Sequence, residues 1–348
     1  MKNLKTALLS DLTIILVIRN RADFTNRWLS YYQSNFPFIK LIIADGSDEM
    51  LFTQSQEQNL PANIHYLYHG PDNDIPTMIR KIRKSISLVK SKFVLLASDD
   101  DFYLLSGIID AIQFLKENAE WHASIGIVRD FTIIKPAEPS DYIYGKVQFG
   151  DELYKSSSIS EPLSFDRIMQ FLVNNESFWH AVYKTESLLR IYSRAEAADI
   201  KSYYQYELFV NIKSAEIGKL HRNRESLFML HQVHPQMEAY KLKNIDKEDA
   251  SLHEEIDFIL GKTFRSLENY NDPPTFESLQ KIRRELTSNT EVITFRSIIQ
   301  RVKFKFARFK LITIVNYLDP FTAKLYRNKE VRGIIEFLGG TNRSKRLI

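Results

Sequence analysis

A short apolar run that leads into three consecutive aspartates constrains this chain more than any other feature. Residues 93–97, Phe-Val-Leu-Leu-Ala, are too few for a capped helix and suit a strand buried on both faces, as in a parallel sheet. Asp99, Asp100 and Asp101 follow after one serine, and their mutual repulsion is unfavourable unless something positive lies there. Because hard oxygen ligands suit Mg²⁺ or Mn²⁺, the pattern predicts a divalent-cation site. The alternative is a solvated acidic turn that caps a helix beginning near Leu104.

Strand-like and helix-like segments alternate through the first third of the chain. Further apolar runs are expected to form strands at 12–18, 39–44 and 64–68, and helical periodicity falls between them, up to about residue 35 and at 76–89. Asp23 or Thr25 is the expected cap of the first helix. This alternation predicts an α/β fold with a mostly parallel sheet flanked by helices, in which the strand ends form one nucleotide-sized crevice.

Bulk properties narrow the class of protein. A length of 348 residues predicts one large domain with an appendage, or two domains. There is no cysteine, so disulfides and thiolate zinc sites are excluded, and the net charge of +4 is too small to argue for nucleic acid. No stretch approaches the roughly 18 apolar residues of a membrane span, and the N-terminus lacks a signal-peptide pattern. A cytoplasmic protein, soluble or peripheral to a membrane, is expected.

Three segments resemble the GT-A nucleotide-sugar glycosyltransferases, particularly glycosyltransferase family 2. They are residues 13–21, Thr-Ile-Ile-Leu-Val-Ile-Arg-Asn-Arg, which match the family's first strand and Asn-Arg turn; residues 44–47, Ala-Asp-Gly-Ser, which match its second-strand carboxylate; and residues 99–101, which match its Asp-X-Asp signature. The resemblance covers about residues 11–110. The chain departs from the family where the first strand ends in Val-Ile-Arg, and in residues 72–77 after Gly70. Both departures concern the identity of the donor and leave the fold unaffected.

The resemblance implies roles for residues at the strand ends. Asp45 would accept a hydrogen bond from the base of the donor nucleotide, although an aspartate before glycine also suits a turn. Asp99 would face the ribose or the metal, and Asp101 would coordinate the Mn²⁺ or Mg²⁺ that bridges the diphosphate. Three basic residues are candidate phosphate partners, or else solvated charges: Arg19, Arg80 and Lys81.

The acceptor half of the site is expected after residue 110. Helices are predicted at 106–117, 164–174 and 185–193 and strands at 125–131 and 178–184, whereas residues 133–164 suit a loop or lid over the acceptor. Family 2 enzymes carry an acidic general base after such a strand and helix. Here Glu207 takes that place, with Leu208 where the family has an aspartate, and it opens a helix to about residue 216. Glu207 also suits a helix N-terminus for its charge alone, and Asp199 and Glu176 are the alternative bases.

Two histidines close a further expected strand at 227–230. Family 2 proteins often finish the catalytic domain with a basic residue and a histidine near the metal or diphosphate. By this resemblance His234 takes the place of that histidine as a metal ligand, and His231 falls where an arginine is common. His180 is expected in the core or lining the acceptor site.

The composition changes after about residue 237. We therefore divide the chain into a catalytic domain at 1–237, with a nucleotide-sugar half at 1–110 and an acceptor half at 111–237, and a helical C-terminal region at 238–348. Residues 301–315 interleave five basic residues with aromatics and contain no acid. This composition suits an in-plane helix on an anionic bilayer, where lipid-linked acceptors occur, or an amphipathic helix packed on the catalytic domain.

These observations predict a metal-dependent glycosyltransferase of the inverting type. It would move a sugar from a nucleotide-sugar to a glycan or lipid-linked acceptor during surface polysaccharide assembly. A nucleotidyltransferase would also place carboxylates at a strand end, but it needs a Gly-rich, Lys-containing loop after the first strand, and residues 19–22 are not one. A glycan- or RNA-binding protein could use the basic, aromatic C-terminal region, but it would leave the acidic crevice unexplained.

Overall fold

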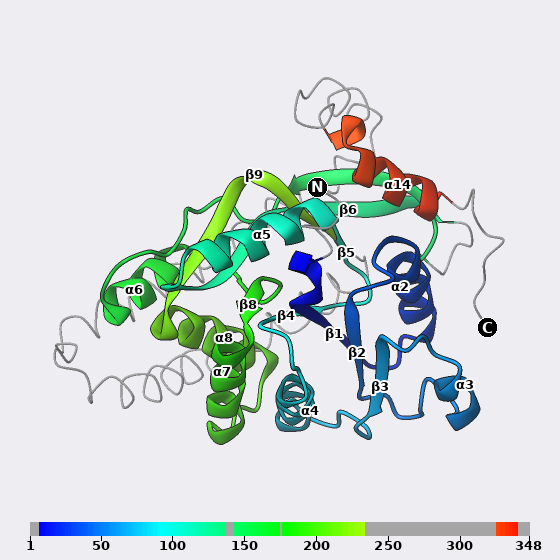
Figure 1. The fold of residues 1–348 in the computed structure, drawn as a ribbon, viewed down its shortest axis with the longest axis horizontal. Coiled ribbons are helices and arrows are strands. Elements are labelled where there is room, and N and C mark those ends of the chain that lie inside the picture. Colours follow the sequence, from blue (N-terminus) through cyan, green and yellow to red (C-terminus); the bar gives the residue numbers. More distant parts are fainter. Residues whose placement is uncertain (1–6, 137–141, 175, 234–324, 340–348) are drawn as a thin grey trace, which may run out of the picture.

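The computed structural model describes residues 7–136, 142–174, 176–233 and 325–339 (Figure 1). Their strands are β1 Leu12–Ile18, β2 Lys40–Asp45, β3 Ile64–Tyr68, β4 Phe93–Ala97, β5 Phe102–Tyr103, β6 Trp121–Pro136, β7 Gly145–Glu152, β8 Val182–Lys184 and β9 Lys219–Gln232. Their principal helices are α2 Ala22–Asn35, α3 Gln54–Gln58, α4 Ile75–Ser87, α5 Leu105–Glu117, α6 Ser164–Asn174, α7 Thr185–Ala197, α8 Tyr203–Ile217 and α14 Lys329–Leu338.

The first four strands form a parallel sheet in the order β3-β2-β1-β4. The pairing Ile18↔Asp45 and Asp45↔Tyr68 brings the carboxyl ends of β1, β2 and β3 to one edge. β4 pairs with β1 through Leu16↔Ala97, so the aspartates that follow β4 reach the same edge. The predicted α/β fold, with a sheet flanked by helices, is confirmed.

The second half extends this sheet with mixed pairing. In the described part of the chain, the nine-stranded sheet continues from β4 through β8, β6, β9 and β5, and β7 pairs with β6. β8 lies antiparallel to both β4 and β6, whereas β6 and β9 run parallel. The sheet is therefore parallel throughout its first half and mixed beyond β4.

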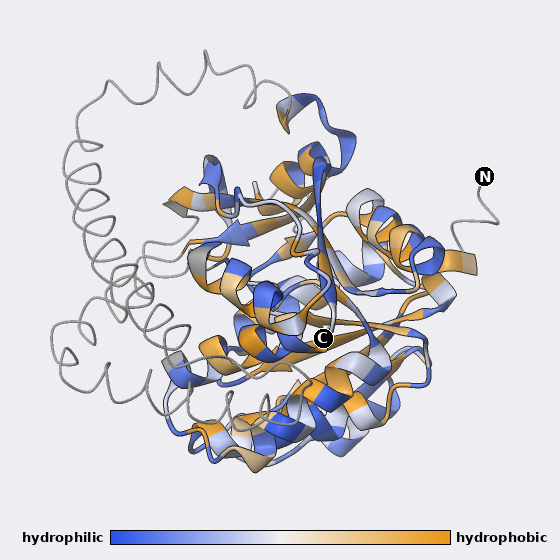
Figure 2. Ribbon diagram, turned by 90° about the vertical axis from the view of Figure 1, so that its left-hand side faces the viewer, coloured by the Kyte–Doolittle hydropathy of each residue, from blue (hydrophilic) through white to orange (hydrophobic). Residues whose placement is uncertain are grey.

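The apolar runs account for the core. Every residue of β4 is buried, as are all of β1 except the half-buried Val17, which is what continuous Val/Ile/Leu runs in a covered parallel sheet require. In Figure 2, hydrophobic residues (orange) are frequent in the strands at the centre of the fold. α4 begins where expected because the Asp74 carboxylate accepts from the Thr77 N–H at 2.7 Å and Pro76 occupies the first turn. α2 corrects the expected cap: it begins at Ala22, before Asp23 and Thr25, and has no side-chain cap.

Residues 133–164 are not one long loop, contrary to expectation. β6 runs on to Pro136 and β7 pairs with it antiparallel, through Phe131↔Phe149 and Ile133↔Val147. Val147 and Phe149 alternate with polar residues and are buried, which is the signature of a strand with one solvated face. The expected strand at 178–184 is also shorter, since only β8 is extended and residues 178–181 form the turn before it.

α14, from the C-terminal region, packs against the sheet and helices described above. Val331, Ile334 and Leu338 are buried at helical spacing, and the Phe337 ring packs near Tyr31 and Phe102. Residues 238–324, including the basic aromatic segment 301–315, lie outside the described residues. In the described part of the chain, no helix has both the length and the apolar composition to cross a bilayer.

Candidate functional site

Asp101, His180 and His231 form a compact group of potential metal ligands. One ligand atom from each lies within 4.8 Å of the others. The His231 Nδ1 is 2.8 Å from one Asp101 oxygen, and the His180 Nε2 is 3.6 Å from the other. Asp101 itself has no exposed surface. Three protein groups that can bind a cation therefore converge at the end of the central strands.

Strand pairing explains how distant residues meet here. β5 follows Asp101 directly and pairs with β9 through Phe102↔Leu230, which places His231 opposite Asp101. His180 comes from the turn before β8, which inserts between β4 and β6. The hydroxyl of Tyr103, the second residue of β5, lies 2.8 Å from the His180 Nδ1, which leaves the His180 Nε2 directed at Asp101.

The donor set and the hydrogen bonding fit a divalent metal ion. The second Asp101 oxygen is buried and has no hydrogen-bond partner among the described residues, as expected of an atom that can bind a cation. One carboxylate with two imidazoles suits transition metals, including Mn²⁺, better than it suits Mg²⁺, which prefers oxygen ligands. Of the predicted ligands, Asp101 belongs to this group and Asp99 does not, while His234 lies outside the described residues.

The ionisation of the group follows from burial and mutual charge. Burial favours the protonated form of Asp101, but the neighbouring His231 outweighs it and lowers the pKa of Asp101. Burial would lower the pKa of His231, but the charge of Asp101 raises it to about 9. Burial lowers the pKa of His180 to about 4, despite the nearby Asp101. A metal-free site thus holds a charged His231–Asp101 pair beside a neutral His180.

Arg21 neutralises the other two aspartates of the triplet. Its guanidinium lies 3.1 Å from Asp99 and 2.9 Å from Asp100, and the Thr25 hydroxyl donates to Asp99 at 3.1 Å. Burial raises the pKa of Asp99, and Arg21 opposes that shift. Arg21 and the two histidines therefore both reduce the repulsion within the triplet, whereas the sequence suggested a divalent cation or a solvated turn. The predicted ribose or metal contact of Asp99 stays a prediction.

Asp45 lies at the expected sheet edge and is already hydrogen-bonded. It is fully buried, and its oxygens accept from the Ser47 N–H at 2.8 Å, the Leu51 N–H at 3.0 Å and the Tyr66 hydroxyl at 2.6 Å. These bonds fix the turn after β2, which is the alternative role considered from the sequence. The contact of Asp45 with a nucleobase stays a prediction.

The basic candidates have different surroundings. Lys81 is buried, forms an ion pair with Asp72 and donates to the Ile18 carbonyl at 2.9 Å. Arg80 lies 3.6 Å from Glu196 on α7. Arg19 is exposed and directly follows β1 at the carboxyl edge of the sheet. Among these residues, Arg19 has the position that best suits a phosphate contact.

Glu207 lies in the first turns of α8 and is exposed, and the Tyr203 hydroxyl is hydrogen-bonded to it. The alternative bases have other surroundings. Glu176 accepts from the N–H groups of Lys155 and Ser156, both at 2.8 Å, and so holds a loop. Asp199 is on the surface beside Lys201. The role of Glu207 as the general base stays a prediction.

Sequence reasoning assigned no role to Arg21, and it expected His180 in the core or lining the acceptor site rather than among the metal ligands. Arg21 stood in the Asn-Arg turn of the family resemblance, which was a usable signal. His180 gave none, because its place depends on the insertion of the short strand β8. The Trp179 beside it bonds the hydroxyls of Tyr192 at 3.0 Å and Tyr206 at 2.6 Å, so this turn is held by a polar network.

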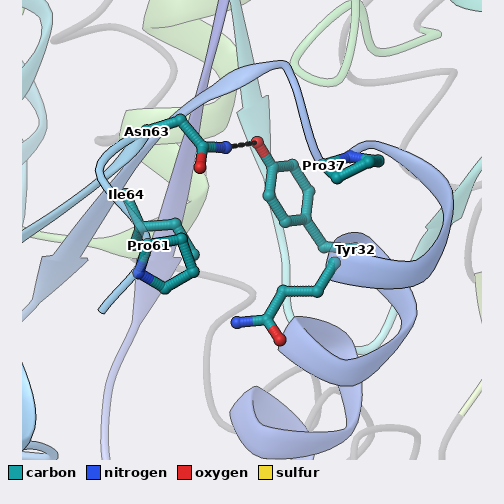
Figure 3. Close-up of a pocket in the computed structure, with 6 residues that line it drawn as sticks. Tyr32, Pro37, Pro61, Asn63 and Ile64 are labelled. Carbon is teal, nitrogen blue, oxygen red and sulfur yellow. Dashed lines mark hydrogen bonds between the residues drawn. The ribbon is translucent and has the colours of Figure 1, made fainter. Parts of the chain in front are cut away.

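A surface pocket of about 210 Å³ lies elsewhere and has a different character. Its lining includes Tyr32, Pro37, Pro61 and Asn63, with Asn63 bonded to the Tyr32 hydroxyl (Figure 3). The two prolines and Asn63 precede β2 or β3, so the pocket is at the amino end of the sheet, opposite the aspartates. It contains no acid or base and belongs to the scaffold.

No protein-family profile and no curated protein sequence matches this chain. Among solved structures, its fold is similar to S. aureus TarS, with 11% identity, a TM-score of 0.47, and coverage of 79% of this chain and 42% of that chain. It is also similar to TarS 1-349 in complex with UDP, with 13% identity and a TM-score of 0.45. For TarS 1-349 in complex with UDP-GlcNAc, the identity is 11% and the TM-score is 0.46. In both, 96% of this chain and 92% of that chain are covered. Similarity at this level concerns the general course of the chain and assigns no role to any residue.

Proposed function

We propose that this chain is a metal-dependent glycosyltransferase that uses a nucleotide-sugar donor. The observation that carries the proposal is the Asp101–His180–His231 group, which lies at the carboxyl edge of an α/β sheet where such folds bind nucleotides. Asp101, His180 and His231 would hold the metal, with Mn²⁺ favoured over Mg²⁺ by the two imidazoles. When bound, the ion would stabilise negative charge on the departing nucleoside diphosphate.

The chain's own residues would bind and orient the donor. Arg19 would contact the diphosphate, since it is exposed at the end of β1. Asp45 and Asp99 would lie on the nucleoside side of the crevice, in line with the strand ends. Arg21 holds Asp99 and Asp100 in place and reduces the repulsion among the three carboxylates.

Glu207 would act as the general base of an inverting transfer. It would take the proton of the acceptor hydroxyl as that oxygen attacks the anomeric carbon, opposite the leaving diphosphate. The Tyr203 hydroxyl would orient the carboxylate through its hydrogen bond. We propose a glycan or lipid-linked glycan as acceptor, and surface polysaccharide assembly at the inner face of a membrane as the setting.

The test is a thermal-shift panel of UDP, GDP, dTDP and CMP and their nucleotide sugars, with Mn²⁺, with Mg²⁺ and with chelator. Wild type is compared with Asp101→Asn and His180→Ala, and Asp199→Asn, whose side chain is 71% exposed, serves as the matched control. A ligand at a hundredfold its Kd stabilises the folded state by about 2.7 kcal/mol.

We expect one nucleotide series to raise the melting temperature of wild type and Asp199→Asn only when metal is present, more with Mn²⁺ than with Mg²⁺. Asp101→Asn and His180→Ala should lose that increase while remaining folded. If no nucleotide shifts the folded wild type, the proposal is wrong. RNA retention that survives Asp101→Asn would then favour a binding protein.

A further inference from the structure

Arg222 on β9 is a buried cation whose guanidinium makes no hydrogen bond. Only 3% of the residue is exposed, and none of its three side-chain nitrogens has a hydrogen-bond partner in the described part of the chain. Its nearest carboxylate oxygen, on Glu176, is 3.9 Å away. Instead, the guanidinium lies 5.1 Å from the Tyr154 ring centre and 4.5 Å from the Phe178 ring centre. Arg222 is therefore held between two aromatic faces.

This arrangement is costly to the folded state. A buried donor that loses its hydrogen bonds to water carries a desolvation penalty, and a buried charge carries a larger one. Stacking on two rings returns part of that energy but supplies no hydrogen bond. An unsatisfied buried polar group in a folded protein calls for an explanation, and support of a functional side chain is one such explanation. Arg222 contacts the rings of Tyr154 and Phe178, and of the two side chains only that of Tyr154 has a polar group.

The backbone around Tyr154 is held on both sides although it belongs to no helix or strand. Arg224 donates to the Tyr154 carbonyl at 2.7 Å, and the Leu153 N–H donates to the Val128 carbonyl at 3.0 Å. Glu176 accepts from the next two N–H groups, each at 2.8 Å. The main chain and the ring of Tyr154 are thus both constrained.

The Tyr154 hydroxyl is the part that these contacts leave unused. In the described part of the chain it makes no hydrogen bond, and the residue is half-buried. Burial raises the pKa of Tyr154, and the charges of Glu207 and Asp101 raise it further. The hydroxyl is therefore available as a hydrogen-bond donor, and its ring lies across Arg222 from Phe178, which opens the turn that carries His180.

We propose that Tyr154 contacts the substrate: its hydroxyl donates a hydrogen bond to the sugar ring of the donor, and Arg222 positions the phenol for that contact. The inference rests on the proposed function, since it places the transferred sugar between Asp101 on the diphosphate side and Glu207 on the acceptor side. Tyr154 would discriminate a nucleotide sugar from the free nucleoside diphosphate.

The test compares Kd values by calorimetry in the presence of Mn²⁺ for matched pairs: UDP with UDP-glucose, GDP with GDP-mannose, and dTDP with dTDP-glucose. For the pair that binds, Tyr154→Phe should weaken the nucleotide sugar by about 3- to 10-fold, the worth of one neutral hydrogen bond, and leave the free diphosphate unchanged. Tyr183→Phe is the matched control, since its hydroxyl lies 3.0 Å from Ser214 in the interior. It should change neither Kd.

Arg222→Met separates positioning from a merely structural role. Replacing an unsatisfied buried cation by an apolar chain should leave the melting temperature unchanged or raise it. The same variant should weaken the nucleotide sugar as Tyr154→Phe does, and the double variant should be no weaker than Tyr154→Phe alone, because Arg222 acts through Tyr154. A structural role would instead lower stability and affect both ligands equally.

The failures are distinguishable. If the folded wild type binds no nucleotide in the panel, the proposed function fails and the role of Tyr154 fails with it. If a nucleotide binds but Tyr154→Phe leaves the ratio of the two Kd values unchanged, only the role of Tyr154 is overturned. A loss of stability in Arg222→Met, with no effect specific to the sugar, overturns the role of Arg222.

Discussion

Glu330 in α14 accepts a hydrogen bond from the backbone N–H of Leu105 at 2.6 Å, across 225 positions of the sequence. It also accepts from the N–H of Ser106 at 3.2 Å. These are N–H groups in the first turn of α5, whose own N-cap residue, Leu104, has no side chain that can accept. A carboxylate at a helix N-terminus also interacts favourably with the helix dipole. α14 therefore supplies the N-terminal cap of α5, a helix that begins four residues after Asp101.

Replacing Glu330 by alanine should lower the free energy of unfolding by about 1 kcal/mol, the usual cost of losing an N-cap acceptor. Urea unfolding measures this change. Arg332→Ala is the control, since Arg332 is exposed on the same helix and should alter stability little. Equal stability of wild type and Glu330→Ala would show that α14 does not cap α5 in solution.

Lys81→Met tests whether this residue is a phosphate partner or part of the scaffold. Lys81 and Asp72 are 2% and 3% exposed, so removing the amine would leave a carboxylate buried without its counter-ion. That change should cost about 3–5 kcal/mol of unfolding free energy, and adding Asp72→Asn should recover part of it. Denaturant unfolding of the two variants and wild type measures both effects. A Lys81→Met protein of normal stability that loses only nucleotide binding would favour the phosphate role.

The parallel half of the fold follows from the sequence because its signals are local. β1, β3 and β4 have the predicted bounds, since continuous apolar runs between turn residues describe a strand buried on both faces. β6 and β9 are longer than predicted because polar residues interrupt or make up their flanks, and only the centre of each strand forms a mainly apolar run. β7 was missed for the same reason.

The candidate site was only partly predictable because it depends on pairings between distant strands. Asp101 stood out as the end of an acidic triplet. His231 reaches it only because β5 pairs with β9, and His180 only because β8 inserts antiparallel beside β4. Neither pairing has a local sequence signal. The satisfied hydrogen bonds of Asp45 likewise depend on Tyr66 in the neighbouring strand.

Glu207→Gln should slow the reaction without weakening donor binding. The amide keeps the size of the side chain and an acceptor for Tyr203, but it cannot take a proton. A general base contributes about 10²- to 10⁴-fold, so the rate should fall by that order. Release of nucleoside diphosphate from the bound nucleotide sugar can be followed in the absence of an acceptor, with water as the attacking group. A variant with the wild-type rate would remove Glu207 from the mechanism, and Glu186→Gln, at an exposed carboxylate on α7, controls for the loss of a surface charge.

Acid should destabilise the protein in part through His221. This imidazole stacks on Phe114, lies beside Trp121 and is 2.9 Å from the Ser124 hydroxyl, and burial lowers its pKa to about 4.

The lowered pKa fixes the sign of the effect. Between the ordinary histidine pKa of about 6.5 and the folded value of about 4, the unfolded chain binds a proton that folded His221 does not. The contribution of His221 is therefore complete above pH 6.5 and is lost progressively as the pH falls towards 4. The free energy of unfolding can be measured with urea from pH 7.5 to 4.5. It should fall less steeply with pH in His221→Gln than in wild type. His65→Gln, at an exposed histidine, is the control and should follow wild type. Parallel curves for His221→Gln and wild type would mean that His221 takes up its proton as readily in the folded state as in the unfolded chain.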